Sequence, residues 1–215
     1  MLNMEEVFQY FENGAKYLGY FTPNEINIKG KLIFEDGDIY EGEWLNNMPN
    51  GRGKYIHKDG IIYEGDWKSD LQHGKGKESW PDGYIYEGDY IKGKKQGKGK
   101  YIFTDGSSYK GDFLENNMHG YGCFIYEDGR IYKGTLVNNL LDGKGIFTFP
   151  DGRKYEDEFK KNKKEGFGIF YWPSGKIYKG NWKNGKPDGE GEYYNPKDKV
   201  WIKVYWENGK MIKRY

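Results

Sequence analysis

The chain has 215 residues, of which 36% are apolar, 31% are charged and 19% are aromatic, and its 33 glycines are an unusually large number. Because disordered chains contain few aromatic residues, the 40 aromatic residues (21 Tyr, 12 Phe and 7 Trp) predict an ordered protein. A net charge of +1 argues against nucleic-acid binding, and no apolar run approaches membrane-spanning length. The single cysteine, Cys123, excludes an internal disulfide and favours a reducing compartment.

Residues 1–16 are expected to form an N-terminal cap. They lack the basic segment followed by an apolar core that marks a secretory signal, so we expect a cytoplasmic protein. The segment Phe11-Glu12-Asn13-Gly14 resembles the turn half of the units that follow. We therefore expect a partial hairpin within the cap, over residues 7–16.

A tyrosine recurs every 23 residues over residues 17–200, without insertion or deletion. Self-similarity at a fixed short period indicates one supersecondary unit stacked many times, and such proteins act through extended surfaces. The sequence thus predicts eight repeats, which begin at Tyr17, Tyr40, Tyr63, Tyr86, Tyr109, Tyr132, Tyr155 and Tyr178.

Each repeat has the pattern of a β-hairpin. Rings and glycines alternate with other residues in the two predicted strands, as in residues 40–44 (Tyr-Glu-Gly-Glu-Trp) and 51–55 (Gly-Arg-Gly-Lys-Tyr). Since side chains along a strand alternate between faces, the rings and glycines are expected to share one face. Asp59-Gly60 and its equivalents predict the hairpin turn. Isoleucines beside this turn, such as Ile56 and Ile62, are expected to pair on the opposite face.

The last segment, residues 201–215, is expected to be a capping hairpin. Trp201 takes the place of the repeat tyrosine, and Asn208-Gly209 supplies a turn. A cap protects the open edge of the sheet from pairing with other chains. The fold class predicted for the whole chain is all-β: an elongated, single-layer, twisted antiparallel sheet of stacked β-hairpins.

The repeat resembles the MORN (membrane occupation and recognition nexus) repeat. Residues 40–44, 51–55 and 59–60 match its Tyr-x-Gly-x-Trp, Gly-x-Gly-x-Tyr and Asp-Gly signature, and the resemblance covers about residues 7–210. It implies a single-sheet array of hairpins. It says less about function, because the family includes cytoskeletal and ciliary scaffolds, radial spoke proteins, junctional membrane proteins and accessory modules of enzymes.

Some repeats depart from the pattern. Ile28 stands where the first repeat should have a glycine, and Asp157 replaces a glycine later in the chain. Glu78 replaces a ring that most other repeats have at its position. The best-formed stretch of rings therefore runs from Tyr40 to Tyr126.

No catalytic or cofactor-binding pattern is found. The Gly-Lys-Gly segments lack the Ser or Thr and the helix of a phosphate loop. His57, His73 and His119 occupy different repeat positions and have no cysteine partners, which argues against a metal site. We expect a protein that is not an enzyme, with no cofactor and no metal.

The first functional hypothesis is a scaffold whose ring-rich face binds an extended segment or a helix of a partner protein, because rings are enriched at binding hot spots. A cytoskeletal, ciliary or axonemal assembly would suit such a protein, for example at a cilium or the cell cortex. The residues predicted to line this groove are Tyr40, Trp44, Tyr63, Trp67, Trp80, Tyr86, Phe103, Tyr109 and Tyr126.

The alternative is a peripheral membrane module that binds anionic phospholipids through basic loops between the strands. Residues 1–152 contain 18 basic and 24 acidic residues, and residues 153–215 contain 16 and 9, so the C-terminal part is basic. This asymmetry also leaves an end-to-end homodimer open. The predicted contacts to lipid or to an acidic partner are Lys92, Lys94, Lys95, Lys160, Lys161, Lys163 and Lys164.

Overall fold

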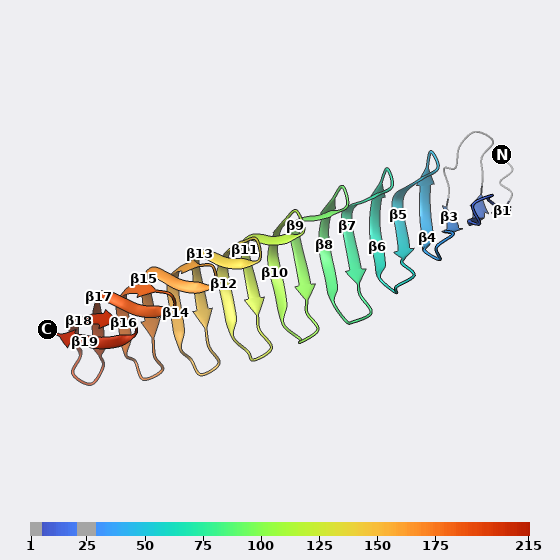
Figure 1. The fold of residues 1–215 in the computed structure, drawn as a ribbon. Coiled ribbons are helices and arrows are strands. Elements are labelled where there is room, and N and C mark those ends of the chain that lie inside the picture. The colour runs from blue at the N-terminus through green and yellow to red at the C-terminus, as the bar shows by residue number, and fades with distance from the viewer. Residues whose placement is uncertain (1–5, 21–28) are drawn as a thin grey trace. The chain divides into compact units, whose positions relative to one another are not determined.

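The computed structural model describes residues 6–20 and 29–215, so Ile28 lies outside the described residues (Figure 1). In this part of the chain there are 19 strands, all in one antiparallel sheet of successive hairpins. The predicted all-β, single-layer hairpin architecture is confirmed.

The chain divides into two compact units, residues 1–104 and 105–215. Within each unit, every strand pairs with its neighbour in the chain. The strands of the first unit are β1 (Glu6–Tyr10), β2 (Lys16–Tyr20), β3 (Lys29–Ile33), β4 (Ile39–Leu45), β5 (Met48–Ile56), β6 (Ile62–Lys68), β7 (Leu71–Ser79), β8 (Ile85–Ile91) and β9 (Lys94–Ile102). Those of the second unit are β10 (Ser108–Leu114), β11 (Asn117–Ile125), β12 (Ile131–Val137), β13 (Leu140–Thr148), β14 (Lys154–Lys160), β15 (Lys163–Tyr171), β16 (Ile177–Lys183), β17 (Lys186–Asn195), β18 (Val200–Glu207) and β19 (Lys210–Arg214).

Two kinds of turn alternate along each unit. The longer turn contains the predicted Asp-Gly pair: between β5 and β6, the His57 amide donates to the Ile61 carbonyl at 2.8 Å, and Gly60 has a φ of 86°. The second turn has only two residues, and Asn46 and Asn47 form it between β4 and β5 with φ values of 52° and 62°. Positive φ at both central residues matches the twist of the flanking strands. The polar stretch that the sequence suggested as a loop is therefore mostly strand.

A register shift between Gly42 and Trp44 keeps the rings of β4 and β5 on one face. Gly42 lies opposite Gly53, whereas Trp44 lies opposite Pro49, so the single residue Glu43 faces residues 50–52 and the bulge lies on β5. The same shift recurs between the corresponding strands of the other repeats, for example at Gly88 and Tyr90.

The repeat tyrosine packs over bare glycine backbone, as expected for rings and glycines on one face. Tyr86 is fully buried, and its hydroxyl donates to the Asp89 carbonyl at 3.0 Å. A Cβ added to Gly99 would lie only 2.6–2.8 Å from Oη, Cε2 and Cζ of Tyr86. Burial raises the Tyr86 pKa because the phenolate would lose its hydration. Glycine at this position is thus required by space.

Edge-to-face ring contacts join one repeat to the next on this face. In the first unit the Tyr40 ring lies 4.9 Å from Trp44 of its own repeat and 5.2 Å from Trp67 of the next. In the second unit the Tyr155 ring contacts Phe159 and Trp182, both at 5.1 Å. The core of each unit is thus a continuous series of rings in the geometry that aromatic pairs prefer.

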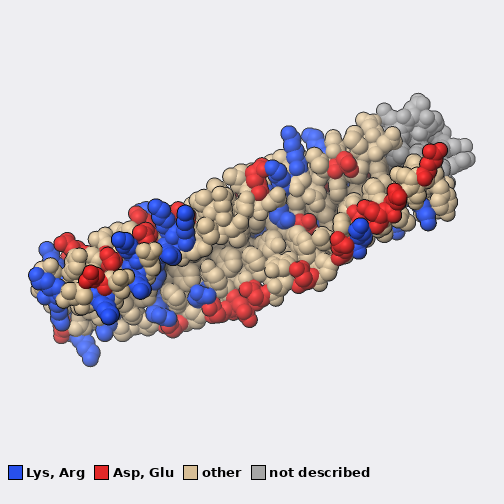
Figure 2. Space-filling view, in the orientation of Figure 1, with Lys and Arg blue, Asp and Glu red and all other residues tan. Residues whose placement is uncertain are grey.

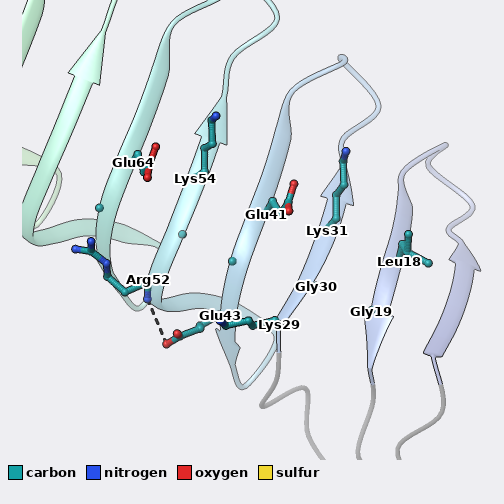
Figure 3. A pocket seen from close by; sticks show the side chains of 13 residues that line it. Leu18, Gly19, Lys29, Gly30, Lys31, Glu41, Glu43, Arg52, Lys54 and Glu64 are labelled. Atoms are coloured by element: carbon teal, nitrogen blue, oxygen red, sulfur yellow. Dashed lines mark hydrogen bonds between the residues drawn. The ribbon is translucent and has the colours of Figure 1, made fainter.

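The opposite face of the first unit is polar in the middle and apolar beside the longer turns. Ile56 pairs with Ile62 across the turn, as predicted. Farther along the strands, Lys54 lies between Glu41 and Glu64 on the neighbouring strands. These side chains project over a shallow hollow whose base is glycine backbone (Figure 3). Cross-strand pairs of opposite charge stabilise such a solvated face.

Candidate functional site on the ring face

The lowest level of the ring face, here called the floor, consists of buried rings. Five residues predicted to line the groove of the first unit belong to it, with exposed fractions of 0–9%. In the second unit the predicted Tyr109 is also fully buried, and burial raises its pKa to about 12. The floor rings hold repeats together and offer a partner little area. The five in the first unit are Tyr40, Trp44, Tyr63, Trp67 and Tyr86.

Half-buried rings form a second level in the first unit, here called the outer row. The Trp80 and Tyr101 rings are 6.0 Å apart, and Tyr101 lies 4.8 Å from Phe103. Among the described residues no second layer of secondary structure covers them, since all strands belong to one sheet. Trp80 and Phe103 were predicted as groove residues. The structure adds Phe34, Tyr55, Tyr84 and Tyr101, three of which recur at ring positions of the sequence pattern.

Asp38 fixes the ring of Tyr55 in the outer row. The buried Asp38 carboxylate accepts hydrogen bonds from the Tyr55 hydroxyl and, at 2.9 Å, from the Lys58 amide. Burial alone would raise the Asp38 pKa, but these hydrogen bonds and the neighbouring positive charges of His57 and Lys58 together outweigh burial and hold the pKa below its usual value. An anchored ring loses less conformational freedom when a partner binds.

The second unit has its own outer row. The predicted Tyr126 is half-buried, packs 5.7 Å from Phe147, and lies beneath the Arg130 guanidinium at 4.7 Å. Phe149 and Trp172 follow in equivalent positions and pack on Phe170 at 6.4 and 4.6 Å, respectively. Neither was predicted as a groove residue, although both recur at a ring position of the sequence pattern.

Lys95 on β9 lies within the ring face of the first unit. Its ammonium is 2.6 Å from a Glu78 carboxylate oxygen, which also accepts a hydrogen bond from Tyr90 at 3.0 Å. The two charged side chains are only 14% and 16% exposed. The Lys95 ammonium also lies 4.7 Å from the centre of the Trp80 ring. Glu78 thus places a carboxylate where most repeats have a ring, and this carboxylate neutralises the largely shielded Lys95 ammonium.

Lys164 on β15 occupies the equivalent place in the second unit. Its ammonium is surrounded by the rings of Phe149, Tyr155, Phe170 and Trp182, at 5.7, 5.1, 4.6 and 4.8 Å from their centres. Burial, with a smaller contribution from the Arg153 charge, lowers the Lys164 pKa to about 8. Cation–π attraction offsets part of the lost hydration.

The other predicted basic contacts are exposed and lie around two-residue turns. Lys92 and Lys161 have positive φ and belong to the turns themselves. Lys94, Lys160 and Lys163 lie on the adjoining strands, as do Lys95 and Lys164. The prediction that these lysines lie mostly in loops is wrong, because the connections have only two residues. Lys95 and Lys164 instead belong to the ring face.

The half-buried ammonium of Lys164 predicts a pH dependence of stability. Its pKa is about 8 in the folded chain and 10.5 ordinarily, so between these values the unfolded state binds more protons. The cost of burying the charge is therefore fully present below pH 8 and is relieved as the pH rises. Urea unfolding should show Lys164→Met more stable than wild type at pH 7, with the difference shrinking by pH 10. Lys183→Met, which removes an exposed charge, is the control, and a pH-independent difference for Lys164→Met would contradict the prediction.

The described residues were also compared with the features of a membrane-spanning helix and of a metal-binding cluster. None of them forms a helix that could span a membrane. Nor does this part of the chain gather three or more His, Cys, Asp or Glu side chains into a cluster suited to a metal ion.

Stacked hairpins with rings over glycine backbone define a β-hairpin repeat protein. The family model for the MORN repeat matches seven segments, residues 40–62, 63–83, 86–108, 109–129, 132–152, 155–177 and 178–198. The chain belongs to the MORN repeat family. The matched segments do not include residues 17–39, which the tyrosine period predicts as a first repeat.

Solved structures share the fold. The TCP10 domain of CPAP from Danio rerio superposes with a TM-score of 0.54 at 16% identity, covering 97% of this chain and 99% of that one. The same domain in complex with a peptide of Danio rerio STIL gives a TM-score of 0.52 at 16% identity, covering 98% and 99%. At such low identity the likeness concerns the fold alone. No curated protein sequence matches the chain at a significant level.

Proposed function

We propose that the protein is a non-catalytic scaffold whose outer ring rows bind extended segments of partner proteins. The observation that carries the proposal is the outer row itself: half-buried rings, among them Trp80 and Phe103, stand above a packed floor. The floor supplies rigidity without help from a partner. The outer row retains apolar surface of the kind that dominates binding hot spots.

The structural comparison supports a peptide as the occupant. The CPAP domain, which has a similar fold, has been solved with a bound STIL peptide. An extended chain also suits a row of rings, because alternate side chains of a strand-like segment point the same way. We place the protein in the cytoplasm, in a cytoskeletal or ciliary assembly.

The lipid-binding alternative rests on exposed lysines near the turns, notably Lys160, Lys161 and Lys163. Flotation with vesicles containing phosphoinositides at low salt would test it. Charge removal at all three positions should abolish flotation if these residues bind lipid. The scaffold proposal expects no lipid-dependent flotation.

The scaffold proposal is tested with a random peptide library displayed on phage and selected on the full chain. Selected peptides should bind at least about tenfold more weakly to Trp80→Ala or Trp172→Ala, depending on which unit they occupy, because hot-spot rings contribute 2 kcal/mol or more. Fluorescence anisotropy with labelled peptides gives the affinities. Circular dichroism checks that each variant is folded.

Matched controls come from the opposite face of the second unit. Tyr121 and Phe167 are 63% and 48% exposed, and each precedes a glycine of the ring face, Gly122 or Gly168. Tyr121→Ala and Phe167→Ala should leave peptide affinity unchanged. Failure to enrich any peptide, or peptides insensitive to both tryptophan substitutions, would rule the proposal out.

A further inference from the structure

Lys164 is a cation for which the described chain provides no carboxylate. Its ammonium contacts four rings, and among the described residues none places a carboxylate within ion-pair distance of it. The nearby Arg153 has its own partner, since its Nε lies 2.7 Å from Asp151. Burying a charge is costly unless it is paired, and cation–π contacts compensate only in part.

The first unit shows how this position is neutralised within the fold. Lys95 lies three repeats before Lys164, and there Glu78 supplies the carboxylate. Three repeats after Glu78 the chain has Phe147, which is buried and 8% exposed. The second unit thus keeps the lysine but replaces its internal acid with a ring.

The strand position itself does not require a lysine. The residues at this position are opposite the large side chain of the preceding strand, and they differ widely between repeats. Other repeats have proline, glutamine, methionine or leucine at this position, so packing against the preceding strand does not require a lysine. The residues at this position in successive repeats are Pro49, Gln72, Lys95, Met118, Leu141, Lys164 and Pro187.

We propose that the second unit binds a partner-protein segment through an acidic side chain that pairs with the Lys164 ammonium, while its apolar residues lie on Phe149 and Trp172. This inference rests on the proposed scaffold function and specifies its ligand in the second unit. The rings around Lys164 shield its ammonium from part of the water, so a carboxylate would interact with it more strongly there than at the exposed surface.

Charge complementarity favours an acidic peptide as the occupant. Residues 153–215 carry 16 basic and 9 acidic residues, and Figure 2 shows Lys and Arg side chains gathered over the region where β13–β19 lie. Such a field attracts acidic segments and speeds their association. A lipid headgroup would instead meet the exposed lysines at the turns, because Lys164 lies among rings rather than at a turn.

The test uses peptides selected from the phage library on the full wild-type chain, restricted to those that lose affinity in Trp172→Ala. These peptides should share an Asp or Glu at one fixed position. Replacing that acid by its amide should weaken binding to wild type about tenfold or more, but change binding to Lys164→Met by less than about twofold. Selection on Lys164→Glu should enrich Lys or Arg at the same position.

The control is Lys183→Met, which removes one exposed positive charge from the same unit. This variant should bind the selected peptides as tightly as wild type does. Replacing the acid of the peptide by its amide should weaken binding to this variant as much as it weakens binding to wild type. Equal loss from the acid-to-amide change in wild type and Lys164→Met would overturn the inference. Peptides that depend on Trp172 but contain no common acid would also overturn it while leaving the scaffold proposal standing, whereas a library without binders would refute both.

Discussion

Gly99→Ala is expected to lower the free energy of unfolding by about 3 kcal/mol, at the upper end of typical overpacking costs. The added Cβ would lie 2.6–2.8 Å from three atoms of the Tyr86 side chain. Tyr86 cannot move aside easily, because it is fully buried and its hydroxyl is hydrogen-bonded to the Asp89 carbonyl. Urea unfolding followed by circular dichroism measures the loss.

A double-mutant cycle separates this steric cause from other effects of alanine. Tyr86→Ala alone should cost about 4 kcal/mol, since it removes a buried ring. In that background Gly99→Ala should be close to neutral, because the ring that opposes the new methyl group is gone. Gly106→Ala is a second control, because the added Cβ would meet nothing within 4 Å. Only the strain of alanine at a φ of 85° should lower the free energy of unfolding, by about 1 kcal/mol. Equal costs of Gly99→Ala in both backgrounds would refute the steric explanation.

Glu78→Gln is expected to destabilise the protein by about 2 kcal/mol. The substitution keeps the shape of the side chain but removes the negative charge 2.6 Å from the Lys95 ammonium, where both side chains are largely shielded from water. Thermal and urea unfolding at pH 7 measure the effect. A variant as stable as wild type would show that Glu78 and Lys95 contribute nothing as a pair.

The compensating variant combines Glu78→Tyr, Tyr90→Phe and Lys95→Met. It installs the residues that the next repeat has at these positions, Tyr101, Phe113 and Met118, and Tyr90→Phe removes the hydroxyl that donates to Glu78. Replacing a buried ion pair by well-packed apolar residues is often neutral or stabilising, so this triple variant should be at least as stable as wild type. Glu78→Tyr alone should be less stable than wild type, because the Lys95 ammonium would lose the Glu78 carboxylate.

The fold could be predicted from the sequence because its main determinants are local and repeated. A 23-residue period, alternation of rings with glycines and an Asp-Gly pair each specify the same hairpin. The two-residue turn at Asn46 and Asn47 was missed, since a run of polar residues resembles a loop. Asparagine tolerates positive φ, and this property allows so short a connection.

The candidate site could be predicted only in part. Sequence alternation assigns rings to a face but not to a level on that face, so the floor ring Trp67 and the outer ring Trp80 looked equivalent. Pairing of Glu78 with Lys95 depends on register across three strands and on side-chain direction. The pattern of lysines suggested solvated loops. In the structure, the bulge and the two-residue turn instead direct the Lys95 and Lys164 side chains toward the rings.

The fixed length of both turns restricts how such a gene can change. A one-residue insertion within a strand would exchange inside and outside for every later side chain of that strand, and the tyrosine would no longer meet its glycines. Loss or tandem duplication of a whole 23-residue module preserves every such match, because each tyrosine is covered by glycines of its own module. Proteins of this kind can therefore vary in size through the number of repeats rather than through the length of their loops.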